Sequence, residues 1–544
     1  MSNVINAELL RKMFLYGAKN LENNKEKINE LNVFPVPDGD TGTNMTLTIL
    51  SAAKELTSLT DTSLPAVCKA ASSGSLRGAR GNSGVILSQL IRGFTKVISK
   101  LEKEELTVAD LTLASENGVK TAYKAVMAPK EGTILTVANG IYKKAAELNE
   151  AGVTDMDKFL QEVIAYGNKV LDETPELLPV LKQAGVVDSG GAGLMALMEG
   201  AYDAFIGKKI DLNFGQSSPK KEEEPKEVEV KFAYEVDFTI NLTHNFNIKN
   251  EIDFKAYMES IGDTISVVVN DEKADIHVNT NDPGLVMQKA LKYGELNNIK
   301  IVNLKVPDSK DEAKTEEKPK DLGPKKTYGF ITVSTGKGIN EIFESLGVDY
   351  IIEGGQTMNP STDDMLKAID NVNAENIFIL PNNKNIILAA NQARDLTKDK
   401  NIIVIPTKTI PQGITAVINF IEDIAPLDNE TAMTEGVQGV KTGQVTYAVR
   451  DTVIDEKEIH KDDFMGIGDK GILSVGKEMN DVTAELIDNL VDDDSELITI
   501  YYGEDVSNED ADSFKETIAK KYSGLDIELQ YGGQPIYYYI ISVE

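Results

Sequence analysis

The chain is poor in the side chains that build covalent or metal-based frameworks. Its 544 residues include one cysteine, Cys68, and 3 histidines. A single cysteine excludes an intramolecular disulfide framework and any metal site made only of cysteines. The surrounding string, Ala66 to Ala71, is helical in character. We therefore expect Cys68 to be a small core side chain rather than a nucleophile.

Long apolar runs are also missing. No stretch is apolar over the roughly 20 residues that span a bilayer, and Met1 to Glu8 lack the basic and apolar regions of a signal peptide. Basic residues are few, because 56 Lys and Arg stand against 87 Asp and Glu, a formal net charge of −31. This charge disfavours nucleic acid as a partner, since arrays of Lys and Arg bind phosphate backbones. We expect a cytoplasmic protein without an integral membrane segment.

Two charged segments divide a chain that is too long for one hydrophobic core. Residues 211–229 and 307–326 contain proline, many charges and few apolar residues, so we interpret them as solvated linkers. The domains predicted on either side of them comprise residues 1–210, 230–306 and 327–544.

Hydrophobic periodicity predicts a different fold class for each domain. In the first, apolar residues recur at three- and four-residue spacing from Leu9 to Leu21 and in the later runs 45–56, 83–101, 119–127 and 156–173. With no convincing β alternation, this domain is predicted to be an all-α bundle.

The second and third domains carry strand patterns. The second alternates over 233–242, 265–269 and 275–279, with helical stretches at 254–261 and 284–293 and a last strand at 301–306, which predicts a small α+β domain. In the third, strands at 328–333, 377–380 and 402–405 alternate with helices, and further strands follow at 472–475, 497–502 and 536–543. A two-lobed α/β domain with a parallel sheet is predicted.

An acidic, glycine-containing loop precedes the helix expected from Thr41 to Leu50. Asp38 and Asp40 flank Gly39, and two carboxylates so spaced suit a hard cation such as Mg²⁺. The following residues, as far as Asn44, place N–H groups and hydroxyls at a helix N-terminus, which favours phosphate. Asp-Gly-Asp alone is equally an ordinary turn, so this loop does not define a site by itself.

Two further glycine-rich segments change that interpretation. Gly78 to Gly84 and Val186 to Gly193 each place small residues directly before a helix. Glycine lets backbone N–H groups approach phosphates closely, so together with the Asp38 loop these entrances predict a nucleotide site. Whether Arg80 contacts phosphate is left open. No Walker A motif is present, because Gly439 to Thr442 has the wrong spacing.

These strings resemble the motifs of the DhaL domain, the ATP-binding part of dihydroxyacetone kinases. The whole chain resembles the bacterial fatty acid kinase catalytic subunit still more closely. The strings that carry the resemblance are 32–45, 81–89, 131–135 and 188–191 in the first domain and 353–362, 380–385 and 405–413 in the third.

The resemblance implies an eight-helix barrel that binds ATP and two Mg²⁺ ions at its open end. Asp38 and Asp40 would be the catalytic metal ligands, with Asn32 near where dihydroxyacetone kinases have a third Asp. Thr41 stands where those kinases have His, which fits the fatty acid branch. The nucleotide would be contacted by Thr43, Asn44, Gly81, Asn82 and Ser83 around the phosphates, and by Leu87, Gly132, Thr133 and Asp188 around the nucleoside.

The acceptor that the resemblance implies is a fatty acid carboxylate, presented by a separate DegV-type fatty-acid-binding protein. A carboxylate is already ionised at neutral pH and needs no general base. A small hydroxyketone would need one, and residues 1–210 contain no histidine. An Asp could also serve as base, so a dihydroxyacetone-type kinase stays open as an alternative, as does a nucleotide-gated regulatory or lipid-binding protein.

The other two domains also resemble those of the family. The family's middle domain binds zinc through one Cys and two His, and these positions fall on Glu235, His277 and Asn279. Zinc favours about four N or S ligands, so zinc is not expected. His277 is interpreted as a strand residue, and His244 and His460 as surface residues.

The C-terminal domain resembles the DegV-like fold of fatty-acid-binding proteins. Its strings Ser334–Gly338 and Gly354–Thr362 could form a ligand site. We favour a role in partner docking or in a homodimer.

Overall fold

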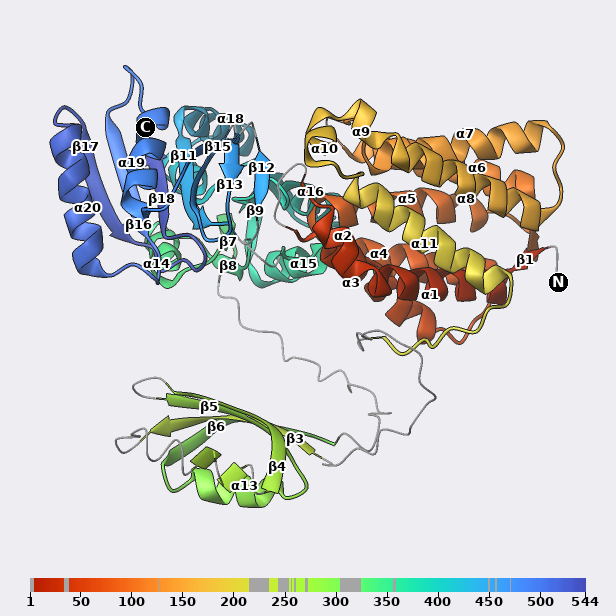
Figure 1. Ribbon diagram of the computed structural model, residues 1–544, viewed down its shortest axis with the longest axis horizontal. Coiled ribbons are helices and arrows are strands. Elements are labelled where there is room, and N and C mark those ends of the chain that lie inside the picture. Colours follow the sequence, from red (N-terminus) through yellow and green to blue (C-terminus); the bar gives the residue numbers. More distant parts are fainter. Residues whose placement is uncertain are drawn as a thin grey trace. The chain divides into compact units, whose positions relative to one another are not determined.

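The computed structural model divides into two compact units, residues 1–218 with 322–544 and residues 219–321. Asp38, His244 and most of both predicted linkers lie outside the residues that it describes. The described residues are 4–33, 39–126, 128–214, 234–242, 254–255, 257–258, 261–269, 273–303, 324–355, 359–448, 451–454, 457–469 and 471–544 (Figure 1).

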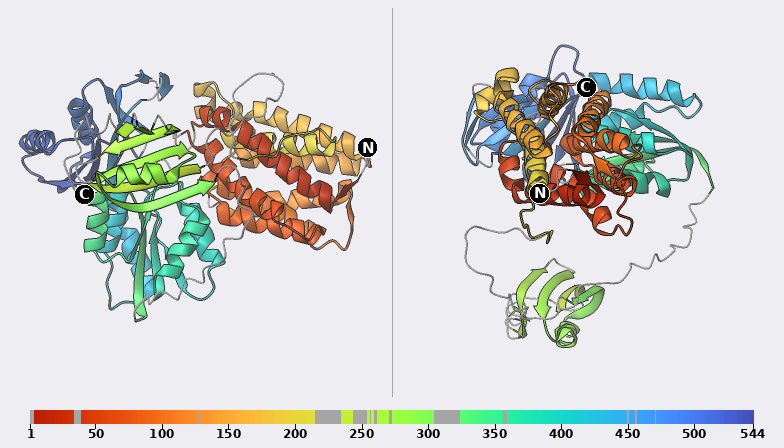
Figure 2. Two further views of the ribbon diagram at one scale, coloured as in Figure 1. Left: turned by 90° about the horizontal axis from the view of Figure 1, so that it is seen from below. Right: turned by 90° about the vertical axis from the view of Figure 1, so that its right-hand side faces the viewer.

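Helices of 15 to 18 residues form the N-terminal domain: α1 (Ala7–Asn23), α3 (Thr41–Thr57), α4 (Leu64–Gly78), α5 (Gly81–Ile98), α6 (Val108–Ala125), α7 (Ile134–Glu150), α8 (Met156–Asp172) and α11 (Ser189–Phe205). Each packs against the next in this order, and α11 packs against α1, so they close into a ring (Figures 1 and 2). The described part of this domain therefore confirms the predicted eight-helix barrel.

Short elements join the long helices. They are α2 (Lys25–Glu30), α9 (Thr174–Leu177), α10 (Pro179–Ala184), and a small ladder in which β1 (Ile5–Asn6) pairs with β2 (Glu105–Leu106). The prediction of a purely helical domain missed this ladder, because strands of two residues carry no alternation.

Apolar side chains fill the inside of the ring. Leu10, Ala18 and Leu21 of α1 are buried, as their spacing predicts, and they join a core shared by all the long helices. A cavity of about 200 Å³, lined almost wholly by apolar side chains, remains inside. Cys68 is 1% exposed, and burial raises the pKa of its thiol to about 12. It is therefore a core residue, as expected.

The middle unit is an antiparallel sheet in the order β4-β5-β3-β6, from β3 (Tyr234–Leu242), β4 (Gly262–Val269), β5 (Lys273–Thr280) and β6 (Gly294–Asn303), with α13 (Pro283–Ala290) packed against β3 and β6. This is the predicted α+β domain. Strand β6 begins before residue 301, since its polar first half pairs with β3 without an apolar alternation.

Strands β3 and β5 bring together the positions compared with the zinc ligands. The register pairs Glu235 with Asn279 and Asp237 with His277. The Nδ1 atom of His277 lies 2.7 Å from an Asp237 carboxylate oxygen. His277 is therefore a strand residue paired with a carboxylate. The prediction that the domain binds no zinc remains a prediction.

The first lobe of the C-terminal domain is a parallel sheet in the order β10-β9-β7-β8. Its strands are β7 (Lys326–Ser334), β8 (Tyr350–Glu353), β9 (Ala374–Leu380) and β10 (Asn401–Val404), and its helices are α14 (Lys337–Ser345), α15 (Thr362–Asn371), α16 (Ile387–Leu396), α17 (Ile410–Ile418) and α18 (Pro426–Gly436), followed by the short η1 (Val437–Gly439).

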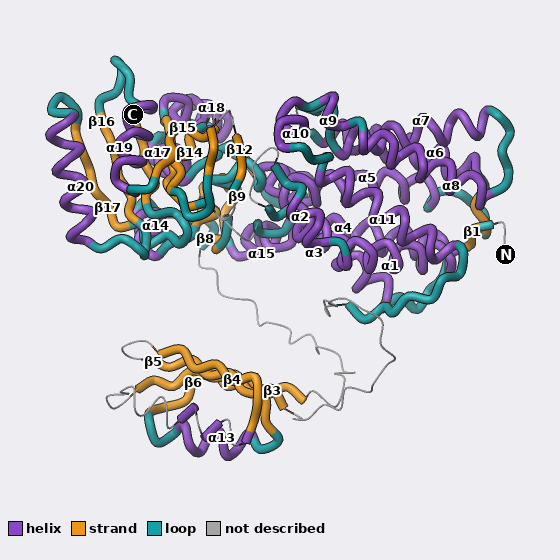
Figure 3. The backbone as a smooth tube through the Cα atoms, in the orientation of Figure 1, coloured by secondary structure: helices purple, strands orange, loops and turns teal. Residues whose placement is uncertain are grey.

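The second lobe is a mixed sheet in the order β15-β14-β11-β18-β16-β17. Figure 3 shows strands of this lobe together with its helices α19 and α20. Its elements are β11 (Lys441–Tyr447), β14 (Phe464–Gly468), β15 (Gly471–Gly476), β16 (Leu497–Tyr502), β17 (Asp526–Tyr531), β18 (Tyr539–Val543), α19 (Met479–Leu490) and α20 (Asn508–Lys521), with a hairpin of β12 (Thr452–Ile454) and β13 (Lys457–Ile459) beside them. The predicted two-lobed α/β architecture is confirmed. His460, just after β13, is exposed, as expected.

Candidate nucleotide site

The four sequence motifs of the N-terminal domain meet where α3, α5, α7 and α11 begin. The Ser189 hydroxyl at the start of α11 donates to the Thr41 hydroxyl at the start of α3, at 3.2 Å. The backbone N–H of Arg80, which precedes α5, donates to Thr48 Oγ1 of α3. Gly190 packs against Ile134, the first residue of α7. Segments separated by up to 148 residues thus share one end of the ring.

Three of these four helix entrances, those of α3, α5 and α7, differ from the other long helices in how they are capped. The residues before α1, α4, α6 and α8 each accept a hydrogen bond from their own helix's first turn, and they are Asn6, Ser63, Thr107 and Asp155. The residues before α3, α5 and α7 accept no such bond among the described residues. Omitting a cap costs a helix about 1 kcal/mol, whereas free N–H groups at a helix N-terminus suit an anion.

A side chain of the neighbouring helix α2 caps α3 instead. Asn29 of α2 accepts a hydrogen bond from the Thr43 N–H at 3.0 Å, and its amide donates to the Thr43 hydroxyl at 3.1 Å. Gly42 makes this approach possible, since a Cβ there would lie 2.2 Å from the Lys25 carbonyl oxygen. Sequence reasoning missed Asn29, because it lies in another helix and in none of the motifs. Its cap leaves the Asp40 carboxylate free to face away from its own helix.

Asp40 is the described member of the predicted pair of acidic metal ligands. It is half-buried, and its Oδ2 accepts a hydrogen bond of 2.6 Å from the Asn359 amide of the C-terminal domain. Asn32, only 2% exposed, accepts a hydrogen bond from the Thr41 hydroxyl at 2.8 Å. Among the described residues, no three His, Cys, Asp or Glu side chains group as a metal site. The proposed metal ligation therefore needs the loop that contains Asp38.

The predicted phosphate contacts of α3 and α5 lie side by side. Gly81 has a φ of +57°, which favours glycine, and a Cβ there would lie 2.6 Å from the Asn44 amide nitrogen. Asn44 is buried, and Ser83 is half-buried in the first turn of α5. The Asn82 amide donates to Asn385 Oδ1 at 3.0 Å, so this side chain also contacts the C-terminal domain.

The predicted nucleoside contacts fall into two groups. Gly132, with a φ of +80°, donates its N–H to Thr136. Thr133 directly precedes α7, whose first residue, Ile134, hydrogen-bonds through its backbone to Asp188 at the start of α11. Leu87 lies elsewhere, fully buried in the lining of the apolar cavity. A nucleoside contact of Leu87 remains a prediction.

Asp188 is a buried carboxyl group with an altered acidity. It is 5% exposed and caps α11, accepting a hydrogen bond of 2.6 Å from the Gly191 N–H. Burial raises its pKa to about 7, although hydrogen bonds from the Gly191 and Ile134 backbones act in the opposite direction. The Asp188 carboxyl group is therefore protonated up to a higher pH in the folded protein than in the unfolded chain.

We expect Asp188→Asn to change how stability depends on pH. Because the pKa is raised on folding, the stabilising contribution of Asp188 is fully present below about pH 4 and is lost as pH rises through about 7. The neutral amide removes this loss, so the stability of the variant relative to the wild type should rise over that interval. Urea-unfolding midpoints without nucleotide measure it, with the exposed Asp172→Asn as control. Parallel pH profiles of wild type and Asp188→Asn would contradict it.

Most of this closed ring of helices lies within residues 35–203, which match the DAK2 domain family. Residues 231–310 match the middle domain, and residues 329–544 the C-terminal domain, of the FakA-like fatty acid kinase family.

Full-length relatives show the same kinship. The chain is 42% identical over 545 residues to protein YloV of Bacillus subtilis, covering 98% of each chain. It is 40% identical over 552 residues to an uncharacterized protein of Staphylococcus aureus strain USA300, covering 100% of each. The chain belongs to the FakA-like fatty acid kinase family and is a kinase.

Solved structures similar to part of this chain include a DegV family protein of Corynebacterium glutamicum, at 12% identity and a TM-score of 0.31, covering 40% of this chain and 96% of that one. Another is the Streptococcus pneumoniae Fatty Acid Kinase (Fak) B3 protein loaded with linoleic acid, at 13% identity and a TM-score of 0.29, covering 40% and 99%. None of the described helices is long and apolar enough to cross a membrane.

Proposed function

We propose that the protein transfers the γ-phosphoryl group of Mg·ATP to the carboxylate of a fatty acid, which a separate DegV-type fatty-acid-binding protein presents. The observation that carries the nucleotide assignment is the convergence of helix entrances whose N-cap side chains do not cap them, beside Asp40. Phosphoryl transfer needs alignment and charge stabilisation more than covalent chemistry, and this end of the ring offers both.

We assign the residues to three roles: phosphate contacts, nucleoside contacts and metal ligands. Backbone N–H groups at the starts of α5 and α7, with Asn44 and Thr43, orient the phosphates, while Gly132, Thr133 and Asp188 border the nucleoside. Asp38 and Asp40, with Asn32, would hold two Mg²⁺ ions. When bound, these ions neutralise the phosphate charge that backbone groups alone leave uncompensated in a chain of formal net charge −31.

The acceptor chemistry needs no proton transfer. A carboxylate oxygen forms the new bond to the γ-phosphorus, the bond between that phosphorus and the β–γ bridging oxygen breaks, and ADP leaves with the electron pair. The acyl phosphate carries the transferred group. The absence of histidine from residues 1–210 agrees with an acceptor that is already ionised.

Turnover assays test this proposal. We expect acyl phosphate to form from ATP and fatty acid only when a DegV-type carrier protein is added, because the free acid is not delivered to the site. The measurement is ADP release together with trapping of acyl phosphate by hydroxylamine. Turnover of dihydroxyacetone without a carrier would instead support the hydroxyketone kinase, and nucleotide binding without turnover of either acceptor would support a regulatory protein.

The remaining assignments follow the family. We propose that residues 1–210 form the kinase domain, that residues 230–306 form a middle domain without zinc, that residues 327–544 serve in partner docking or in homodimer formation, and that the protein works in the cytoplasm. Arg80 points to the C-terminal domain, as its contacts below show, so we assign it to domain docking rather than to phosphate.

A further inference from the structure

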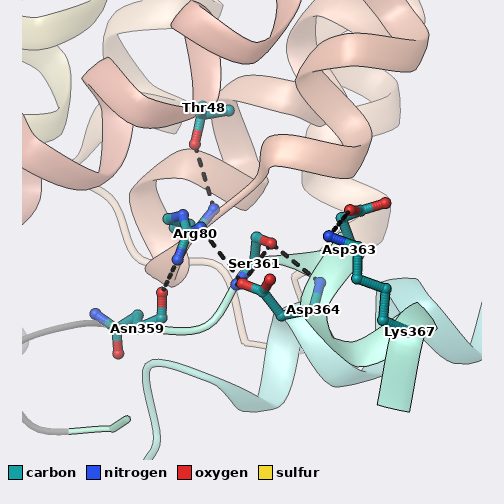
Figure 4. Close-up of polar contacts among 7 residues, drawn as sticks. All are labelled: Thr48, Arg80, Asn359, Ser361, Asp363, Asp364 and Lys367. Atoms are coloured by element: carbon teal, nitrogen blue, oxygen red, sulfur yellow. Dashed lines mark hydrogen bonds and ion pairs between the residues drawn. The ribbon is translucent and has the colours of Figure 1, made fainter. Parts of the chain in front are cut away.

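The C-terminal domain is docked on the nucleotide end of the helical ring. The backbone N–H of Thr362, at the start of α15, donates to the Ala79 carbonyl oxygen just before α5, at 3.1 Å. The Arg80 guanidinium donates to the Asn359 carbonyl oxygen at 2.9 Å and lies 3.3 Å from the Asp364 carboxylate. Figure 4 shows Arg80 between these two residues. The glycine-rich entrance of α5 is thus held by a loop that lies far from it in the sequence.

Asp364 keeps the charge that this ion pair needs. Burial raises its pKa, but hydrogen bonds from Ser361 and the charges of Arg80 and Lys367 outweigh burial and bring the pKa below its usual value. Its carboxylate also completes a capping box with Ser361 at the start of α15. Ser361, which directly precedes α15, is therefore hydrogen-bonded to the first turn of this helix.

A buried amide on α16 makes the docking specific. Gln392 is 6% exposed. Its Oε1 accepts from the Gln89 amide of α5 at 2.7 Å, and its Nε2 donates to the Leu76 carbonyl oxygen of α4 at 2.7 Å. Separating the domains would break both bonds at once. Because buried amides need partners, this pairing selects one docked arrangement.

Asn359 reaches from this loop to the predicted metal ligand. It is 3% exposed, and its Nδ2 donates to Asp40 Oδ2 at 2.6 Å. The other end of the same amide is not satisfied, since Asn359 Oδ1 is buried without a hydrogen-bond partner among the described residues. An acceptor oxygen without a donor thus belongs to the same amide whose nitrogen contacts the Asp40 carboxylate.

Both groups are hard oxygen ligands of the kind that Mg²⁺ takes, directly or through its waters. The Asp40 carboxylate accepts from the Asn359 amide nitrogen, whereas the amide oxygen has no donor among the described residues. A cation, with its water, would give that oxygen a partner and would also bind the carboxylate. The orphaned oxygen thus points to a ligand independently of Asp40.

We infer that the C-terminal domain completes the metal–nucleotide site of its own chain, with Asn359 as a positioning residue for Asp40 and an oxygen donor to the cation shell. This inference rests on the proposed function, whose site it deepens. Such a site would couple cation binding to docking of the C-terminal domain. A cation that binds the docked state more tightly must favour docking by the same factor. Only the docked chain holds the complete set of metal-binding oxygens.

Metal binding to the full chain tests the inference without any turnover. Mn²⁺ can replace Mg²⁺, and its electron paramagnetic resonance reports the free ion in the presence of a non-hydrolysable ATP analogue. We expect Asn359→Ala to weaken Mn²⁺ binding about tenfold, the lower end of the range for loss of an outer-shell partner. Asn371→Ala, at the far end of α15, should leave it unchanged.

A second variant tests the effect of domain docking without removing the Asn359 side chain. Gln392→Glu places a buried carboxylate against the Leu76 carbonyl oxygen and leaves Asn359 intact, so it should undock the domains and weaken Mn²⁺ binding to the same extent. Spin labels at Lys96→Cys and Lys398→Cys, two residues lining one cleft between the domains, should give a narrow distance distribution that broadens in Gln392→Glu. Bound Mg²⁺ with the analogue should narrow it again.

The outcomes distinguish this inference from the proposed function. If Asp40→Ala weakens Mn²⁺ binding but Asn359→Ala and Gln392→Glu change it less than twofold, the C-terminal domain does not complete the site and the inference is wrong, while the kinase site stands. If Asp40→Ala also leaves Mn²⁺ binding unchanged, the proposed metal site itself is wrong.

Discussion

Replacing Asp40 by alanine should lower kcat about a thousandfold or more, the scale on which loss of one charge-stabilising group slows phosphoryl and acyl transfer. The carboxylate is half-buried, makes no cap on its own helix and faces the site. Asn29 caps α3 in its place, so the helix should survive the change. We therefore expect a large loss of turnover with little change in melting temperature. Acyl phosphate formation with carrier present measures the first, and differential scanning fluorimetry the second.

The matched control is Asp61→Ala, which removes an exposed aspartate from the loop beyond the other end of α3. It should keep wild-type turnover. Asp38→Ala should behave like Asp40→Ala, because both carboxylates are predicted metal ligands. Wild-type rates for Asp40→Ala would remove this loop from the site.

Gly81→Ala should weaken nucleotide binding about a hundredfold. The new methyl group would lie 2.6 Å from the Asn44 amide nitrogen, and φ at this position is +57°. The left-handed conformation costs a non-glycine residue roughly 1–2 kcal/mol, and relief of the contact must move the α5 entrance or Asn44, both predicted to hold phosphates. The strain lowers stability, whereas the displaced phosphate contacts lower affinity; a hundredfold change in Kd corresponds to about 3 kcal/mol of binding free energy. Titration calorimetry with the non-hydrolysable analogue measures it.

Gly152→Ala is the control for backbone strain, because it introduces a similar strain without a contact to a neighbouring side chain. Gly152 follows α7 with a φ of +74°, and a Cβ there would meet nothing within 4 Å. It should lower stability by a similar strain and leave nucleotide affinity unchanged. If Gly81→Ala binds nucleotide as tightly as Gly152→Ala does, the α5 entrance does not contact the phosphates.

Elements with a regular period could be predicted from the sequence. The apolar spacing of Leu10, Ala18 and Leu21 gave the inward face of α1, and the alternation around Val236 and Val278 gave a buried sheet face. What escaped prediction has no period. The β1–β2 ladder is two residues long on each side, and β6 pairs through its backbone while its side chains are largely exposed.

The candidate site divides in the same way. Its motifs are local strings, so Asp40, Gly81 and Asp188 could be found from composition and spacing, and a resemblance could order them. Asn29 and Asn359 could not, because each contributes one amide whose importance depends on a tertiary contact. The string Gly354–Thr362 was predicted to serve in partner docking or in a homodimer, and that stays a prediction. Its described residues contact the N-terminal domain of the same chain, which the sequence did not indicate.

The N-terminal and C-terminal domains contact each other, although the unit of residues 219–321 lies between them in the sequence. A covalent connection makes the meeting of the two surfaces an intramolecular event, with an effective concentration set by the connecting segment. The contacts of Arg80 and Gln392 therefore need only a weak intrinsic affinity to keep the domains together. A modest affinity also lets the interface open and re-form within a catalytic cycle, and it gives any protein competing for the same end of the ring a barrier that it can overcome.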